Sequence, residues 1–246
     1  MFTASAVTTE LKKIGSPSKA KASAWFFKTE KGEYGFGDVF VGVTVPEQRK
    51  IAKRFSELSL GEIEKLLRSK IHECRLTALF ILVGQFNRGD LRTRSEIVRL
   101  YLRNRSRVNN WDLVDSSASY ILGQYLLRRD RKILYTLVRS KSLWDRRIAI
   151  IATLALIKND EYSDTLKLSE LLLQDKHDLI HKAVGWMLRE VGNKSLATEE
   201  EFLIKHATTM PRTMLRYATE KFPEKKRKKF LTIFRSPSSH RLGCRE

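Results

Sequence analysis

Apolar residues recur at three- and four-residue intervals along most of the chain, and this spacing is typical of amphipathic helices. Thr44 can cap a helix, Pro46 suits its first turn, and Glu47 completes a capping box, so one helix is expected to begin here. Alternating strand patterns are nearly absent, with one weak candidate at residues 38–45. The chain is therefore predicted to be all-α. Further helices are predicted at residues 60–68, 73–86, 93–104, 111–126, 131–138, 143–157, 166–173, 179–191, 199–207 and 213–222.

A repeat of about 36 residues organises these helices. Arg75, Trp111, Arg147 and Lys182 follow one another at distances of 36, 36 and 35 residues. A two-helix unit of this length is slightly shorter than the roughly 40–47 residues of HEAT and armadillo repeats. We therefore predict a right-handed superhelical array of HEAT-like helix pairs, an α-solenoid, with these four residues in a row along its concave side. Four residues further on, a second row would contain Leu79, Asp115, Ile151 and Trp186.

Composition narrows the class of protein. The 246 residues are 42% hydrophobic and 30% charged, which is too apolar for a disordered chain. No apolar stretch approaches the roughly 18 residues of a membrane helix, and the first residues lack the apolar segment of a secretory signal. Two cysteines, Cys74 and Cys244, cannot form a disulfide framework or a four-thiolate zinc site. We expect a cytoplasmic protein without a membrane part, metal or cofactor.

The charge indicates a polyanionic partner. Lys and Arg number 47 against 28 Asp and Glu, a formal net charge of +19. Five basic residues lie at positions 225–229, so we divide the chain into a flexible lead-in at 1–20, a helical-repeat domain at 21–222 and a basic tail at 223–246. Charge alone does not separate DNA from RNA, or an enzyme from a packaging protein.

A glycine-rich segment covers residues 29–44. Its glycines fit neither a P-loop nor a dinucleotide-binding motif, because no Gly-Lys-Ser/Thr follows and the spacing differs. An ordered loop between helices is the simpler interpretation.

Trp186 lies off the apolar arc of its helix, among Lys182, Arg189 and Glu190. A tryptophan of the core is not expected there. A partly covered surface ring is one interpretation. A contact with a nucleic-acid backbone or base is the other, because basic residues flank the indole.

Trp111 and Asp115 lie four residues apart and therefore share a helix face, and small residues follow them. Small residues would allow a ligand to approach. The alternative is structural, because Trp111 can pack at a helix start where Asp112 and Asp115 complement the helix dipole. Helical periodicity alone does not settle which side Asp115 faces.

Arg147 belongs to a helix that is otherwise apolar almost all round. A guanidinium in such a place must reach a carboxylate, a carbonyl or a phosphate. A salt bridge to another repeat and a phosphate contact both remain open.

Three strings resemble one family: Trp111-Asp-Leu-Val-Asp115, Trp144-Asp-Arg-Arg147-Ile-Ala and Lys182-Ala-Val-Gly-Trp186-Met-Leu-Arg-Glu. In this order they resemble the AlkD-type DNA alkylation repair glycosylases, HEAT-like repeat proteins that excise N3- and N7-alkylated purines. The resemblance covers roughly residues 20–222. It implies that the protein acts on duplex DNA without a base-recognition pocket.

The resemblance also implies roles for individual residues. The catalytic aspartate would be Asp115. Trp111 and Trp186 would be the two tryptophans beside the sugar backbone, and Arg147 would be the arginine that contacts a phosphate. A family tyrosine corresponds to Phe26, which lacks the hydroxyl. The further DNA-binding residues expected here are Lys182, Arg189 and Arg75.

The resulting hypothesis is a monomeric, monofunctional alkylpurine DNA glycosylase that acts on double-stranded DNA containing alkylated bases, in the cytoplasm with the chromosomal DNA. An alternative is a non-catalytic helical-repeat protein that binds damaged or branched DNA. A third is a scaffold for protein partners, with merely solvated basic rows. Salt-sensitive duplex binding would separate the two DNA-binding hypotheses from the scaffold. Release of a methylated base would separate the glycosylase from the non-catalytic protein.

Overall fold

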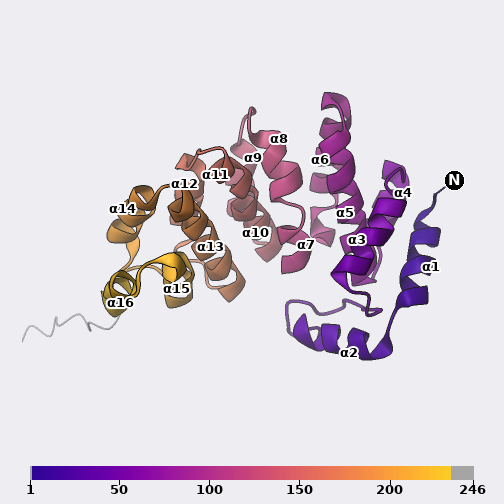
Figure 1. Cartoon of the computed structure of the whole chain (residues 1–246), viewed down its shortest axis with the longest axis horizontal. Helices are drawn as coiled ribbons and strands as arrows, with labels where there is room; N and C mark the ends of the chain where they lie inside the picture. The colour runs from indigo at the N-terminus through magenta and orange to yellow at the C-terminus, as the bar shows by residue number, and fades with distance from the viewer. Residues whose placement is uncertain (1, 234–246) are drawn as a thin grey trace, which may run out of the picture.

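The computed structural model describes residues 2–233, and within that range all regular structure is helical. The helices stand side by side in a curved array that runs from α1 to α16 (Figure 1). The predicted all-α solenoid is therefore confirmed. The helices are α1 (Ala4–Ile14), α2 (Pro17–Phe26), α3 (Val45–Arg54), α4 (Leu60–Leu67), α5 (His72–Arg88), α6 (Leu91–Arg103), α7 (Trp111–Asp115), α8 (Gln124–Leu126), α9 (Lys132–Val138), α10 (Leu143–Ala152), α11 (Leu154–Lys158), α12 (Ser163–Leu172), α13 (Asp178–Lys194), α14 (Leu196–His206), α15 (Arg212–Ala218) and α16 (Glu224–Ile233).

One row of helices forms the backbone of the array. Helix α5 packs against α7, α7 against α10, α10 against α13, and α13 against α15. The four repeat positions predicted from the sequence fall near the beginning of α5, α7, α10 and α13. The 36-residue spacing thus identifies equivalent places in successive helices of this row.

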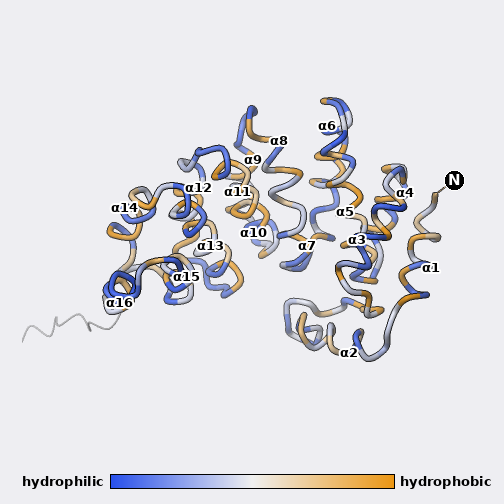
Figure 2. Tube along the Cα trace, in the orientation of Figure 1, coloured by the Kyte–Doolittle hydropathy of each residue, from blue (hydrophilic) through white to orange (hydrophobic). Residues whose placement is uncertain are grey.

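Buried apolar side chains fill the space between the helices, and each helix of the array carries both apolar and hydrophilic positions (Figure 2). A glycine allows α13 and α15 to approach closely, because a Cβ at Gly185 would lie 2.4 Å from the carbonyl oxygen of Met214. Gly123 serves the same purpose beside α10, where a Cβ would lie 2.2 Å from the oxygen of Ala152.

The prediction of a flexible lead-in at residues 1–20 is wrong. Helix α1 begins after Thr3, whose hydroxyl accepts a hydrogen bond from the backbone of Ala6. Val7 and Leu11 are fully buried, and the backbone N–H of Ala4 donates to the Glu62 carboxylate at 2.7 Å. Few apolar residues mark this helix in the sequence, but they share the face that packs on α3, α4 and α5.

Two predicted helices are interrupted. The segment 111–126 divides into α7, a π-helical turn at Ser119–Gly123 and α8, and the segment 143–157 divides at Thr153 into α10 and α11. Two of the small residues after Asp115 are buried rather than open to a ligand: Ser117 and Ala118 are 0% exposed. They allow close packing, and the Ser117 hydroxyl meets Tyr101 at 3.1 Å.

The beginning of the basic tail is also ordered. Helix α16 carries the basic run 225–229, and Phe230 is buried against Phe222 with ring centroids 5.7 Å apart. Phe234 and the residues after it lie outside the described range.

Truncation before Pro223 should lower stability but leave cooperative unfolding intact. The truncation removes Phe230 and exposes Phe222, which together amount to the burial of about one aromatic side chain. We therefore expect the free energy of unfolding to fall by about 2–3 kcal/mol. Urea denaturation of the two chains measures it. An unchanged midpoint would mean that α16 contributes nothing, and a lost cooperative transition would make α16 the indispensable cap of the array.

Candidate active site and nucleic-acid interface

A cavity of about 530 Å³ opens at the beginning of α7, α10 and α13. It brings together seven of the eight residues that the sequence singled out. Arg75 is the exception. The lining consists of Phe26, Lys28, Tyr34, Trp111, Asp115, Arg147, His177, Asp178, Leu179, Lys182, Trp186, Arg189 and Tyr217.

Asp115 and Arg147 form a two-pronged ion pair between α7 and α10. Nε of Arg147 donates to Oδ1 of Asp115 at 3.0 Å, and Nη2 donates to Oδ2 at 2.8 Å. The third nitrogen, Nη1, donates a hydrogen bond to the carbonyl oxygen of Leu179 on α13. The arginine therefore joins three neighbouring helices of the row, and in this structure it contacts a carboxylate and a carbonyl rather than solvent.

The carboxylate of Asp115 is the more accessible partner of this pair. Its side chain is 19% exposed against 6% for Arg147. Burial raises the pKa of Asp115 above its ordinary value, although the adjacent guanidinium of Arg147 pulls the pKa down. The result is a partly desolvated carboxylate at the edge of the cavity, whose charge depends on its arginine.

Two indoles flank the cavity. Trp111 begins α7, where the side chain of Asn110 accepts its backbone N–H at 2.8 Å, and its ring packs edge-on against Phe26 at 5.9 Å. Trp186 is half-buried on α13, and its indole N–H donates to Glu190 at 2.9 Å. Both ring systems are therefore oriented by neighbours while lining the open cavity.

Lys182 and Arg189, two basic residues of the cavity, each have an acidic partner. Lys182 pairs with Asp178 at 2.7 Å and is 40% exposed, so it remains available to a ligand. Arg189 pairs with Glu220 and lies 3.6 Å from Glu190.

Tyr34 is a lining residue that sequence reasoning missed. It comes from the glycine-rich segment and packs edge-on against Trp144 with centroids 6.0 Å apart. Burial is the main cause that raises the pKa of Tyr34, so its hydroxyl stays protonated. The loop thus adds a tyrosine to the lining, in addition to Tyr217, whereas Phe26 has no hydroxyl.

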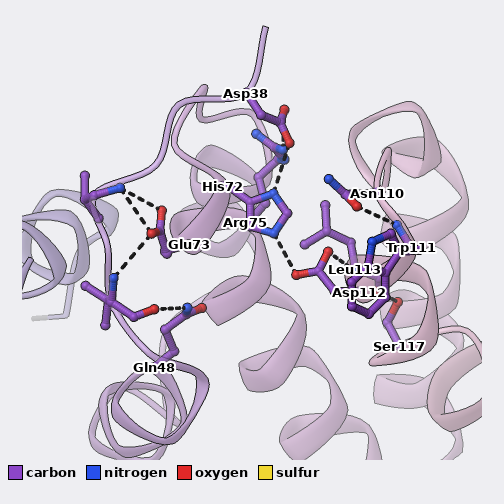
Figure 3. A network of polar contacts seen from close by, with 12 residues as sticks. Asp38, Gln48, His72, Glu73, Arg75, Asn110, Trp111, Asp112, Leu113 and Ser117 are labelled. Atoms are coloured by element: carbon purple, nitrogen blue, oxygen red, sulfur yellow. Dashed lines mark hydrogen bonds and ion pairs between the residues drawn. The ribbon is translucent and has the colours of Figure 1, made fainter. Parts of the chain in front are cut away.

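A buried polar network holds this loop against α5 and α7 (Figure 3). His72 lies between two carboxylates, with Nδ1 3.0 Å from Asp38 and Nε2 2.8 Å from Asp112. The imidazole also packs against the rings of Phe27 and Phe40, with centroids 5.1 and 4.6 Å away, and those two rings stack on each other at 5.2 Å. The network connects the loop to the residue that directly follows Trp111.

The prediction that Arg75 faces DNA is wrong. Its side chain is 4% exposed and pairs with Asp38 at 2.7 Å, beneath the loop. The second predicted row also fails at two places, because Leu79 and Ile151 are 0% exposed and belong to the core. Helical position alone did not reveal that the loop covers α5.

The charge of His72 should make stability depend on pH. Asp112 and Asp38 raise the pKa of His72 above its ordinary value despite the opposing effect of burial. Because this pKa is raised, the charged imidazole contributes its full stabilisation below the pKa of His72 in the unfolded chain, about 6.5. The contribution is lost as the pH rises through the pKa of His72 in the folded protein.

Thermal denaturation from pH 6 to pH 9 is the measurement. We expect the melting temperature of wild type to fall over this range, and His72→Gln to be less stable at pH 6 with a flatter profile. His177→Gln is the matched control, because burial lowers the pKa of His177 and its contribution has the opposite sign. A His72→Gln profile parallel to that of wild type would contradict the assignment.

Among residues 2–233, no cluster of side chains could hold a metal ion, and no helix is long and apolar enough to cross a membrane.

Comparisons with known proteins identify the family of the chain. A family model described as DNA alkylation repair enzyme matches residues 7–222. A comparison with curated proteins gives no match. Among solved structures, a predicted DNA alkylation repair enzyme from Enterococcus faecalis is similar with a TM-score of 0.69 and 18% identity, over 85% of this chain and 97% of that one. That likeness supports the fold. The family match covers most of the chain, and the protein therefore belongs to the DNA alkylation repair enzyme family.

Proposed function

We propose that the protein is a monofunctional DNA glycosylase that hydrolyses the N-glycosidic bond of cationic N3- and N7-alkylpurines in duplex DNA. The observation that carries this proposal is the Asp115 carboxylate at the edge of a cavity flanked by Trp111 and Trp186. The protein is proposed to act as a monomer, and its substrate is double-stranded DNA that contains alkylated bases.

The chemistry needs few groups. An N3- or N7-alkylpurine already carries a positive charge, so it leaves as a neutral base without a general acid. Positive charge then develops on the sugar, where the Asp115 carboxylate stabilises it and orients the attacking water. The faces of Trp111 and Trp186 add cation–π stabilisation of about 0.5–2 kcal/mol.

Other lining residues would hold the DNA. Lys182 and Arg189 are proposed to contact phosphates, which fix orientation without reading sequence. Phosphates would compete for these side chains with Asp178 and Glu220. Phe26 contributes an apolar wall, and Arg147 is proposed as the counterion that keeps Asp115 charged and as a phosphate contact in the complex.

One observation favours a non-catalytic alternative. Both oxygens of Asp115 are engaged by Arg147, which disperses the negative charge that the sugar cation would need. A protein with this site could bind damaged or branched DNA without cleaving the glycosidic bond.

Release of free base from methylated duplex DNA, followed by chromatography, separates these functions. The proposal predicts release of 3-methyladenine and 7-methylguanine above the spontaneous rate. Salt-sensitive binding without release would support the non-catalytic alternative. Absence of duplex binding at low salt would instead favour a scaffold for protein partners.

A further inference from the structure

Helix α2 is unusual because none of its residues, all of which the structure describes, is buried. It lies beside the glycine-rich segment, outside the row of packed helices (Figure 1). Its last turn carries Trp25, which is 82% exposed, and Phe26, which is 56% exposed. Large aromatic side chains at such exposure indicate a binding surface, because they gain nothing from the protein's own core.

The position of α2 is nevertheless fixed. The backbone N–H of Ser16, just before α2, donates to the carbonyl oxygen of Val41 at 2.9 Å. At Gly42 a Cβ would lie 2.2 Å from the oxygen of Ser16, so the loop and the start of α2 are in tight contact. Trp25 is therefore presented on a held helix rather than on a loose end.

A second cavity, of about 510 Å³, lies beside Trp25. Phe26 and Lys28 line both this cavity and the one that contains Asp115, so the two adjoin. Whatever occupies the cavity at Trp25 would therefore be a direct neighbour of the group bound at Asp115.

The charges around Trp25 favour a nucleobase over a phosphate inside this cavity. The lining contains two lysines and two glutamates, whose charges balance: Lys21, Lys28, Glu30 and Glu33. The carboxylate of Glu33 accepts the backbone N–H of Glu30 at 3.2 Å, which keeps negative charge at the rim. A neutral ring with polar edges fits such a lining, whereas the excess charge of the whole chain favours a polyanion around it.

Lys28 closes the C-terminal end of α2. Its backbone has a φ of 54°, the left-handed conformation of a Schellman cap, in which the N–H of Thr29 donates to the carbonyl oxygen of Ala24 and the N–H of Lys28 to that of Trp25, each at 3.2 Å. This lysine lines both cavities. The cap fixes the end of α2 and, with it, the positions of Trp25 and Lys28 beside the two cavities.

We propose that Trp25 and this cavity form a second site, which stacks an unpaired nucleobase of the bound DNA next to the lesion site. This inference rests on the proposed DNA-binding function. The faces of paired bases are covered by their neighbours in a duplex, so an indole finds a free face only where a base has left the stack. Stacking of one base on an aromatic side chain is sequence-tolerant, because every base has such a face.

The test compares two duplexes. In one, 2-aminopurine lies opposite a tetrahydrofuran abasic analogue and is free to leave the stack, and in the other it is paired with thymine. Wild type should bind the first about tenfold more tightly and quench its fluorescence by stacking. Trp25→Ala should lose both the preference and the quenching while binding the paired duplex like wild type.

Two further variants keep the result interpretable. Phe36→Ala is the matched control, because Phe36 is an aromatic residue of the adjoining glycine-rich segment that is 63% exposed and lines neither cavity. It should behave like wild type. Lys28→Gly should raise the melting temperature, because the left-handed backbone favours glycine, and yet weaken binding to the orphan-base duplex.

Each contrary outcome has a definite meaning. Wild type that binds both duplexes equally and without quenching would overturn the second site and leave the proposed function standing. Trp25→Ala with an equal loss on both duplexes would make Trp25 a backbone contact and would also overturn it. Failure of wild type to bind either duplex would overturn the proposed function together with this inference.

Discussion

Replacing Asp115 by Asn should reduce the rate of base release on the order of 100-fold or more, because it removes the carboxylate that is proposed to stabilise the sugar cation. Duplex affinity should stay the same or rise slightly, since a negative charge near the phosphates is lost. Single-turnover release from a methylated duplex, with binding measured in parallel, tests both expectations. Circular dichroism verifies folding, because Arg147 loses its ion-pair partner.

Asp178→Asn is the matched control. Asp178 lines the same cavity but pairs with Lys182 and is 55% exposed, so its charge is screened by solvent. This variant should release base at nearly the wild-type rate. Equal rates for wild type and Asp115→Asn would remove Asp115 from the mechanism.

Arg147→Ala should have the largest effect on stability. Removing one partner of a buried ion pair lowers the free energy of unfolding by about 3–5 kcal/mol, because the charge of the other partner is left without compensation. Without the guanidinium, the pKa of Asp115 should rise further, since Arg147 is the group that opposes the effect of burial. Base release at neutral pH should therefore fall, and it should recover partly at higher pH as Asp115 ionises.

Urea denaturation and a pH–rate profile measure these two effects. Retained stability with an unshifted profile would contradict the role of Arg147 as counterion. The dependence of duplex affinity on salt tests the separate proposal of a phosphate contact, for which the slope of log affinity against log salt should decrease in magnitude by about one.

The repeat explains why much of the site could be predicted from the sequence. Trp111, Arg147 and Lys182 lie at equivalent places near the beginning of successive helices, so a fixed spacing in the sequence places them along one side of the array. Asp115 and Trp186 lie one turn further on and line the same cavity. Periodicity aligns these positions because each helix of the row packs on the next. It does not distinguish Asp115 from Leu79 and Ile151, which are buried at equivalent places, and the family resemblance singled Asp115 out.

Features outside the repeat could not be predicted in this way. The loop that covers Arg75 and presents Tyr34 has no helical period, and its contacts are long-range: Asp38 and Asp112 lie 34 and 40 residues from His72. Helix α1 escaped notice because its buried face consists of a few residues, among them Val7 and Leu11. The partner of Arg147 also remained open, since carboxylate, carbonyl and phosphate satisfy a guanidinium equally well in a sequence pattern.

The central claim is that one carboxylate, without an acid partner, serves only bases that leave as cations. It is tested most directly by a single-turnover reaction of wild type with a duplex that carries both 7-methylguanine and uracil. Chromatography of the free bases should detect 7-methylguanine above its spontaneous rate and no uracil. Release of both bases would contradict the single-carboxylate mechanism, and release of neither, with tight binding retained, would contradict the enzymatic function itself.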